Sequence, residues 1–176
     1  YSHLIDTLFV SDASINQAIA NLNKKIGKYN GLTIKRNKDR LYLDGDELSI
    51  RLLYKEALYI ESQDNIFNLD VLAAYYDKFN LLELKTWLEE ILEKHKYKIN
   101  IYSYPMLILH LGIIVDRVIS DKGLTKIDIE ADIDDNALEK LISEELFSII
   151  SDKLEINIPK TEIELFSYIL LSKSRN

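Results

Sequence analysis

The sequence of 176 residues contains no cysteine, only two prolines and only five glycines. Without cysteine, disulfide bonds, thiolate metal ligands and cysteine nucleophiles are excluded, as in many cytoplasmic proteins. The scarcity of proline and glycine leaves little room for flexible linkers. The longest apolar run, Met106 to Val115, is shorter than the roughly 20 residues of a membrane-spanning helix, so we expect no membrane span. The sequence shows neither an initiator methionine nor a signal peptide, which we interpret as an N-terminal truncation.

The net charge of −7 is unevenly distributed along the chain. Residues 1–60 carry 9 Lys/Arg and 7 Asp/Glu, a net of +2, whereas residues 61–176 carry 13 and 22, a net of −9. Residues 24–40 contain seven basic side chains and a single acidic one, Asp39. Positive charge of this density suits a polyanion such as nucleic acid, although a solvated face is the default explanation for any charge run.

Two apolar stripes at helical spacing lie in the first 30 residues. The first consists of Leu4, Ile5, Leu8 and Phe9, and the second of Ile15, Ala18, Ile19, Leu22 and Ile26. Between them, Ser11 is a good N-cap and Asp12 suits the first helical turn. Two helices joined so closely are the outline of a helix-turn-helix. We expect the second helix to turn Ile15, Ala18, Ile19 and Leu22 inward.

This projection leaves an outer face that is small, rich in amides and basic toward its end. Its predicted DNA-contacting residues are Ala13, Asn16, Gln17, Asn21, Lys24, Lys25 and Lys28. Amides read adenine edges, small side chains allow close approach, and lysines hold phosphates. An amphipathic helix whose amides only keep it soluble fits the helix alone equally well.

The following segment favours DNA binding. Leu32 and Ile34 alternate before a basic tip and Leu41 and Leu43 alternate after it, which predicts a two-stranded hairpin. A hairpin after a recognition helix is a wing, whose tip meets phosphates or a minor groove. The predicted DNA-contacting residues of this tip are Lys35, Arg36, Lys38 and Arg40.

The sequence therefore predicts a mainly α protein with two domains. Residues 1–62 are expected to form a winged helix-turn-helix, closed by a helix that Asp44 or Asp46 caps and that has Arg51 on its polar side. Residues 63–176 are expected to form a bundle of five helices. These helices are expected at about 67–80, 81–95, 104–122, 136–154 and 160–174. The third is apolar almost all round, which makes it the central one.

A family resemblance lies in the segments VSDASINQAIANLNKKI and GLTIKRNKDRLYLDGDELSIR. They resemble the winged helix of bacterial transcription regulators that carry phosphotransferase-system regulation domains (PRDs), and of the related Mga-type virulence regulators. The wing of this family ends in a pattern present here as Leu43, Gly45, Asp46, Glu47 and Arg51. Gly45 is expected where the strand turns into the next helix.

The five helices resemble a single PRD. In that family a histidine is followed by an aliphatic helix face and then by an arginine. The matching residues here are His110 and Arg117, in the segment HLGIIVDR. The two residues are about two turns apart and share a face. The resemblance implies that His110 accepts a phosphoryl group from a phosphocarrier protein, whereas the residues alone also fit a structural core histidine. The second histidine of many PRDs is replaced by Ile169, which leaves single-site or phosphorylation-independent sensing.

No enzyme motif is present: a Walker loop, a dinucleotide fingerprint, HExxH and a nucleophile elbow are all missing. The acidic residues from Asp128 to Asp135 lack the spacing of a calcium loop, so we expect a solvated loop, no metal and no cofactor. We expect a cytoplasmic, homodimeric regulator that binds double-stranded DNA and phosphocarrier proteins. The alternative is an oligomerisation module of a Mga-type regulator, with no phosphorylation and weak or no DNA binding.

Overall fold

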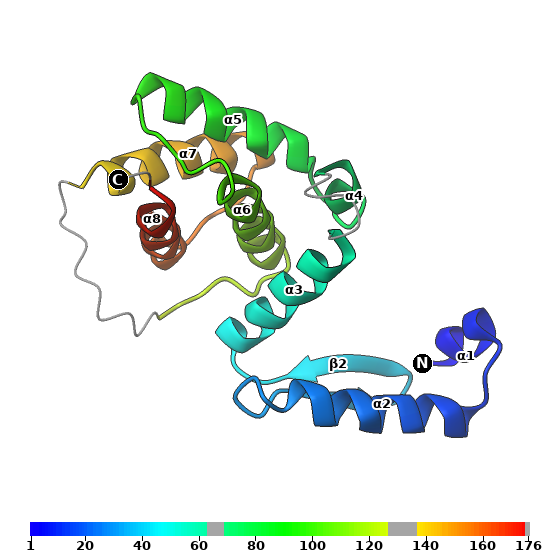
Figure 1. Cartoon of the computed structure of the whole chain (residues 1–176). Coiled ribbons are helices and arrows are strands. Elements are labelled where there is room, and N and C mark those ends of the chain that lie inside the picture. The colour runs from blue at the N-terminus through cyan, green and yellow to red at the C-terminus, as the bar shows by residue number, and fades with distance from the viewer. Residues whose placement is uncertain (63–68, 127–136, 175–176) are drawn as a thin grey trace. The chain divides into compact units, whose positions relative to one another are not determined.

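A computed structural model describes residues 1–62, 69–126 and 137–174 (Figure 1). The described residues form eight helices and one two-stranded sheet. The chain divides into two compact units, Tyr1–Ala57 and Leu58–Asn176, which we call the N-terminal and C-terminal units. This division falls inside α3 (Glu47–Ser62), whereas the sequence placed the boundary after residue 62.

The N-terminal unit has the order helix, helix, hairpin, helix. Two helices, α1 (Ser2–Leu8) and α2 (Asp12–Ile26), precede the strands β1 (Thr33–Asn37) and β2 (Arg40–Asp44), and α3 follows. The strands are antiparallel, with Ile34 opposite Leu43. Lys38 has a φ of 54°, the left-handed conformation that two-residue hairpin turns favour. The predicted winged helix-turn-helix is confirmed.

Both predicted helix caps of this unit are present. The backbone N–H of Ser14 donates to Ser11 Oγ at 3.1 Å, which caps α2. At the start of α3 the capping residue is Asp46 and not Asp44, because the Ser49 N–H donates to Asp46 Oδ1 at 2.9 Å. The Ser49 hydroxyl donates to Asp46 Oδ2 at 2.6 Å, and these hydrogen bonds hold the pKa of Asp46 below its usual value.

The core of the N-terminal unit is small. Its buried members are Ile26, Tyr29, Leu32 and Ile50, with Ile34, Leu43 and Leu53 packed against them. Gly45 is needed here for a steric reason: a Cβ atom would lie 2.6 Å from Leu32 Cδ1, and Leu32 is fully buried. Arg51 does not lie on the polar side of α3 as predicted, since it is buried with its Nε 2.9 Å from Glu47 Oε1.

The predicted inward face of α2 is wrong in part. Ile15 is buried and Ile19 is half-buried, but Ala18 is exposed and the exposed fraction of Leu22 is 45%. Ile26 belongs to the core against which Ile34 and Leu43 of the hairpin pack. Leu22 stays exposed although it lies two turns from Ile15 and so on the same side of α2. The helix α1 buries none of its own residues, and both Leu8 and the following Phe9 are exposed.

The C-terminal unit is a helical bundle, as predicted. It contains α4 (Leu69–Ala73), α5 (Leu81–Lys94), α6 (Tyr104–Ile119), α7 (Leu138–Leu154) and α8 (Lys160–Lys173). The four longer helices form a closed ring, in which α5 contacts α6, α6 contacts α8, α8 contacts α7 and α7 contacts α5 (Figure 1). The helix expected over about 67–80 is wrong in its extent, because α4 ends at Ala73; this short helix packs against α5.

The helix α6 has the most buried residues of the five, as expected from its apolar sequence, but it is one of the four helices of the ring and not a central one. Its buried residues are Leu107, Ile108, Leu109, Leu111, Gly112, Ile113, Ile114, Val115 and Val118. Gly112 allows a close approach, because a Cβ atom there would lie 2.9 Å from Leu81 Cδ1 and 3.0 Å from the Tyr76 hydroxyl. Phe147 and Phe166 pack edge to face at 5.4 Å between α7 and α8.

An ion pair joins α5 to α7. The side chain of His95 is only 16% exposed, and its Nε2 lies 2.8 Å from Glu145 Oε2. Lys94 Nζ lies 2.5 Å from the other oxygen of Glu145. These hydrogen bonds hold the pKa of Glu145 below its usual value, because both partners favour the charged carboxylate.

We expect Glu145→Gln to destabilise the C-terminal unit at neutral pH by up to about 1 kcal/mol, as is typical of a partly exposed ion pair. A carboxyl with a lowered pKa stabilises the fold above its unfolded-state pKa, near 4.5, and this contribution is lost as pH falls through the folded-state pKa. The difference in free energy of unfolding between the parent protein and the variant should therefore become smaller at acidic pH. Urea unfolding followed by circular dichroism over a pH series measures it.

The matched control is Glu164→Gln, which removes a more exposed carboxylate 3.8 Å from Lys160 on α8. It should change the free energy of unfolding less than Glu145→Gln does. Equal effects of the two substitutions at all pH values would show that the pair between α5 and α7 contributes nothing specific.

Candidate nucleic-acid interface

The candidate interface combines the outer face of α2 with the wing. All eleven residues that the sequence predicted to contact DNA are exposed: Ala13, Asn16, Gln17, Asn21, Lys24, Lys25, Lys28, Lys35, Arg36, Lys38 and Arg40. Their contacts within the protein differ, and these differences divide them into three groups. One group joins α2 to the wing, a second makes pairs within one element or with a neighbouring one, and a third makes no such pairs.

One link between α2 and the wing was not predicted. Asn23, on α2, donates through Nδ2 to the backbone oxygen of Ile34 at 3.1 Å, and the Ile34 N–H donates to Asn23 Oδ1 at 2.6 Å. The sequence contained a signal for this contact, since Asn23 interrupts the apolar stripe between Ile19 and Ile26 at helical spacing. A polar residue at such a position needs a partner.

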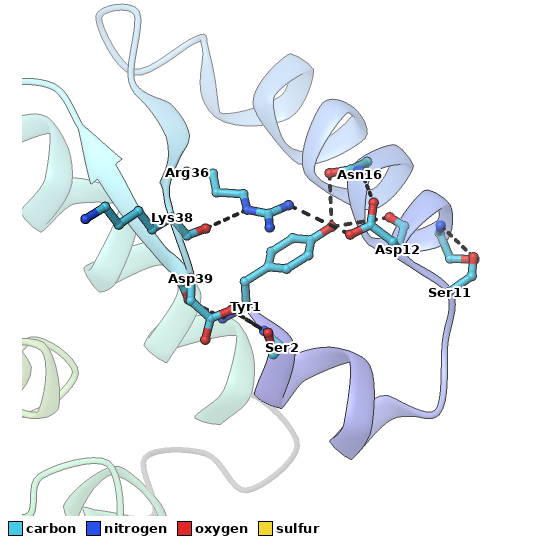
Figure 2. A network of polar contacts seen from close by, with 9 residues as sticks. Tyr1, Ser2, Ser11, Asp12, Asn16, Arg36, Lys38 and Asp39 are labelled. Carbon is cyan, nitrogen blue, oxygen red and sulfur yellow. Dashed lines mark hydrogen bonds and ion pairs between the residues drawn. The ribbon is translucent and has the colours of Figure 1, made fainter.

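A second link lies near the tip of the wing (Figure 2). The Arg36 guanidinium lies over the ring of Tyr1, with Cζ 3.6 Å from the ring centroid. Its Nε donates to the backbone oxygen of Lys38 at 2.8 Å, and its terminal nitrogen lies 3.8 Å from Asp12 Oδ1. The wing tip is thereby connected to the first turn of α2. At the turn itself, hydrogen bonds from Ser2 lower the pKa of Asp39.

Asn16 belongs to this second link and not to the outer face where the sequence placed it. Asn16 and Asn23 are seven residues apart, about two helical turns, so they lie on the same side of α2. Asn16 Nδ2 donates to Asp12 Oδ2 at 2.8 Å, and the Tyr1 hydroxyl donates to Asn16 Oδ1 at 3.1 Å (Figure 2). Its amide is therefore engaged within the protein.

Several other predicted residues also have partners. Gln17 Nε2 donates to Asn21 Oδ1 at 3.2 Å along α2. Lys35 Nζ lies 2.5 Å from Asp44 Oδ2 on the neighbouring strand, which raises the pKa of Lys35. Lys28 Nζ lies 3.6 Å from Glu56 Oε2 and 4.7 Å from the centroid of the Tyr29 ring.

Four cations form the third group. Lys24 and Lys25 on α2, and Lys38 and Arg40 on the wing, make no ion pair with any residue that the structure describes. Exposed cations on a helix and on an adjacent hairpin can neutralise phosphates on the two sides of one groove. These four residues are therefore the best placed to meet a polyanion.

The comparison with protein families assigns the N-terminal part. Residues 1–58 match the family model described as the Mga helix-turn-helix domain. The N-terminal residues 1–58 are thus similar to a Mga-type helix-turn-helix domain. The match covers all of the elements that build the candidate interface, and it indicates a DNA-binding regulatory protein, since this is not an enzyme family. A comparison with curated protein sequences gave no match.

The Mga-type domain ends where the helical bundle begins, so the match leaves the predicted sensor residues unassigned. His110 and Arg117 are both half-buried on α6, while the residues between them are buried except for Asp116. Each of the two side chains takes part in an interaction within the protein. Both are therefore accessible in part and already engaged.

Two kinds of feature are absent from the described residues. None of the helices there has the length and apolar character needed to cross a bilayer. No group of three or more histidine, aspartate or glutamate residues among them is arranged to hold a metal ion. The acidic residues from Asp128 to Asp135 lie outside the described residues.

We expect Arg36→Lys to loosen the wing turn, because lysine keeps the charge but loses the stacking on Tyr1 and the geometry of the bond to the Lys38 backbone. Loss of about 1 kcal/mol of local stability corresponds to roughly fivefold faster amide exchange in residues 38–40. Hydrogen exchange followed by mass spectrometry measures this rate.

Lys24→Arg is the control, because it exchanges one cation for another on the outer face of α2, away from the wing turn. It should leave the exchange of residues 38–40 unchanged. If Arg36→Lys also left it unchanged, the guanidinium network would not be what holds the turn.

Proposed function

We propose that this protein is a cytoplasmic transcription regulator that binds double-stranded DNA through α2 and the wing. We further propose that its helical bundle is a PRD-like sensor, controlled by the sugar phosphotransferase system through phosphorylation of His110. The observation that carries the proposal is the Mga helix-turn-helix match over residues 1–58. The control by phosphorylation of His110 is a separate part of the proposal, with an experiment of its own.

The charge distribution supports the choice of DNA as the ligand. Lys24 and Lys25 continue the exposed outer face of α2, and Lys38 and Arg40 flank the turn of the wing. Phosphate contacts from such residues orient the protein on the duplex, while Gln17 and Asn21 on the same outer face can reach base edges. The net charge of −9 over residues 61–176 keeps that part of the chain away from the duplex.

The position of His110 supports its role as a phosphorylation site. It lies on α6, the helix that joins α5 and α8 in the closed ring, and its side chain is half-buried. A phosphoryl group adds roughly −1.5 to −2 charges at neutral pH. This charge, beside buried aliphatic residues, requires a cation such as Arg117 or a change in packing. In a homodimer, such a change would alter the spacing of two winged helices on DNA.

One observation favours a second function. Asn16, Arg36, Lys28 and Lys35 all have partners within the protein, and α1 exposes Leu8 and Phe9. A domain with engaged polar residues and an open apolar side can serve as a protein-interaction or oligomerisation module. In that case the protein would bind DNA weakly or not at all and would not depend on phosphorylation.

We expect Lys24→Ala and Arg40→Ala each to weaken binding to a mixed-sequence duplex. Each should also reduce the slope of log affinity against log salt by about 1, because one phosphate contact is lost. Fluorescence anisotropy over a salt series measures both quantities.

Lys160→Ala is the control, since it removes the same charge from α8 in the C-terminal unit. Its slope should match that of the parent. Affinity for duplex DNA that is weak and insensitive to salt in the parent protein would contradict DNA binding by this protein and favour the interaction module.

For the sensor, we expect the parent protein to acquire acid-labile phosphate when it is incubated with phosphoenolpyruvate and the general phosphotransfer proteins, with or without a sugar-specific carrier. His110→Ala should acquire none, because the accepting imidazole is gone. Intact-mass spectrometry under non-acidic conditions measures the incorporation.

His3→Ala is the control, because His3 is exposed on α1 and should not affect the incorporation. The absence of phosphate in the parent protein with every donor would show that His110 is a structural residue. The regulator would then sense its signal by another route.

A further inference from the structure

The two bonds from Asn23 to Ile34 use every polar atom of the carboxamide that faces the wing. Nδ2 donates to the Ile34 backbone oxygen, and Oδ1 accepts from the Ile34 N–H. Only one orientation of the amide satisfies both bonds, because its nitrogen can only donate and its oxygen can only accept. The side chain is half-buried, so a polar group lost here would leave backbone groups of the wing partly shielded from water.

The site of attachment is the root of the wing and not its tip. Ile34 is the second residue of β1 and lies opposite Leu43 of β2, and both pack against the small core that contains Ile26 and Leu32. The bonds therefore fix the direction in which the hairpin leaves the domain. The wing cations lie farther along the same two strands, so a small rotation at the root displaces them by a larger distance.

Asn23 itself is turned away from the outer face of α2. On a helical projection it shares its side with Asn16 and Ile19, whereas Gln17, Asn21 and Lys24 lie on the outer face. Its polar atoms are also occupied by Ile34. Asn23 is therefore unsuited to contact a base or a phosphate directly.

We propose that Asn23 is a positioning residue for DNA binding: it holds the wing cations at a fixed place relative to the cations of α2. The inference rests on the proposed function. Cations on two elements reach phosphates of one duplex together only if the elements keep their relative placement, and preorganisation of this kind removes an ordering cost from binding. Loss of the attachment frees the wing without removing any charge.

The test is Asn23→Ala in the full chain, with a mixed-sequence duplex as the probe. We expect affinity at low salt to fall about tenfold, equivalent to the loss of two coupled hydrogen bonds. The slope of log affinity against log salt should also fall by about 1 or more, although every lysine and arginine is still present. A purely structural defect would reduce the fraction of active protein, measured by stoichiometric titration, and leave the slope unchanged.

The matched control is Asn30→Gly. Asn30 is an exposed amide of the same unit that bonds to Asp46 at 3.0 Å, and its φ of 50° suits glycine. This variant loses a side-chain hydrogen bond but keeps the attachment between α2 and the wing, so its salt slope should equal that of the parent. Asn23→Ser is the second variant if the alanine protein does not fold, since serine stays polar but cannot reach both backbone groups of Ile34.

The outcomes separate the two proposals. Salt-dependent binding by the parent and by Asn30→Gly, with a lower slope in the Asn23 variants, supports the positioning role. The same parental binding with an unchanged slope in folded Asn23 variants overturns the positioning role but leaves DNA binding intact. If the parent protein itself shows no salt-dependent binding, the proposed function fails, and the positioning role fails with it.

Discussion

Two hydrogen bonds between the Asn23 carboxamide and the backbone of Ile34 join the second helix of this protein to its wing. The small core beneath them has four buried members, so packing supplies only part of the attachment. The guanidinium of Arg36 adds a second point of contact near the first turn of α2. A surface made of a helix and a hairpin can recognise one ligand only if such contacts keep the two elements in register.

The cations of this surface differ in whether they must leave an ion pair within the protein before they can bind a phosphate. Lys35 and Arg36 are held by Asp44 and Asp12, so a phosphate would have to compete with a carboxylate for each of them. Exposed ion pairs of this kind are weak, and the competition costs little per pair. Lys24 and Arg40 need no such exchange. Affinity should therefore depend more on the unpaired cations, and the shape of the surface more on the paired ones.

Much of this fold follows from local signals in the sequence. Apolar periodicity predicted α2 and the bundle helices, Ser11 and Asp46 predicted helix starts, and alternation predicted the hairpin, because each of these depends on neighbours a few residues away. The orientation of α2 did not follow. Its apolar stripe is covered only in part, so Leu22 is exposed although Ile15 and Ile26 on the same side of the helix are buried. The pair between His95 and Glu145 was also missed, because its partners are 50 residues apart.

The candidate site was predictable in composition but not in detail. Ten of the eleven predicted residues are polar, and their exposure follows from that character, whereas the engagement of Asn16 and Arg36 depends on Tyr1, which precedes α1. Asn23 has a consequence for the free edge of the hairpin as well. Ile34 faces Leu43 in β2 yet gives both of its backbone groups to Asn23, so these groups point away from the partner strand. An open strand edge invites pairing with a foreign chain. In this protein the Asn23 side chain bonds to that edge at Ile34 as a third strand would, so these two backbone groups are not available to a foreign strand.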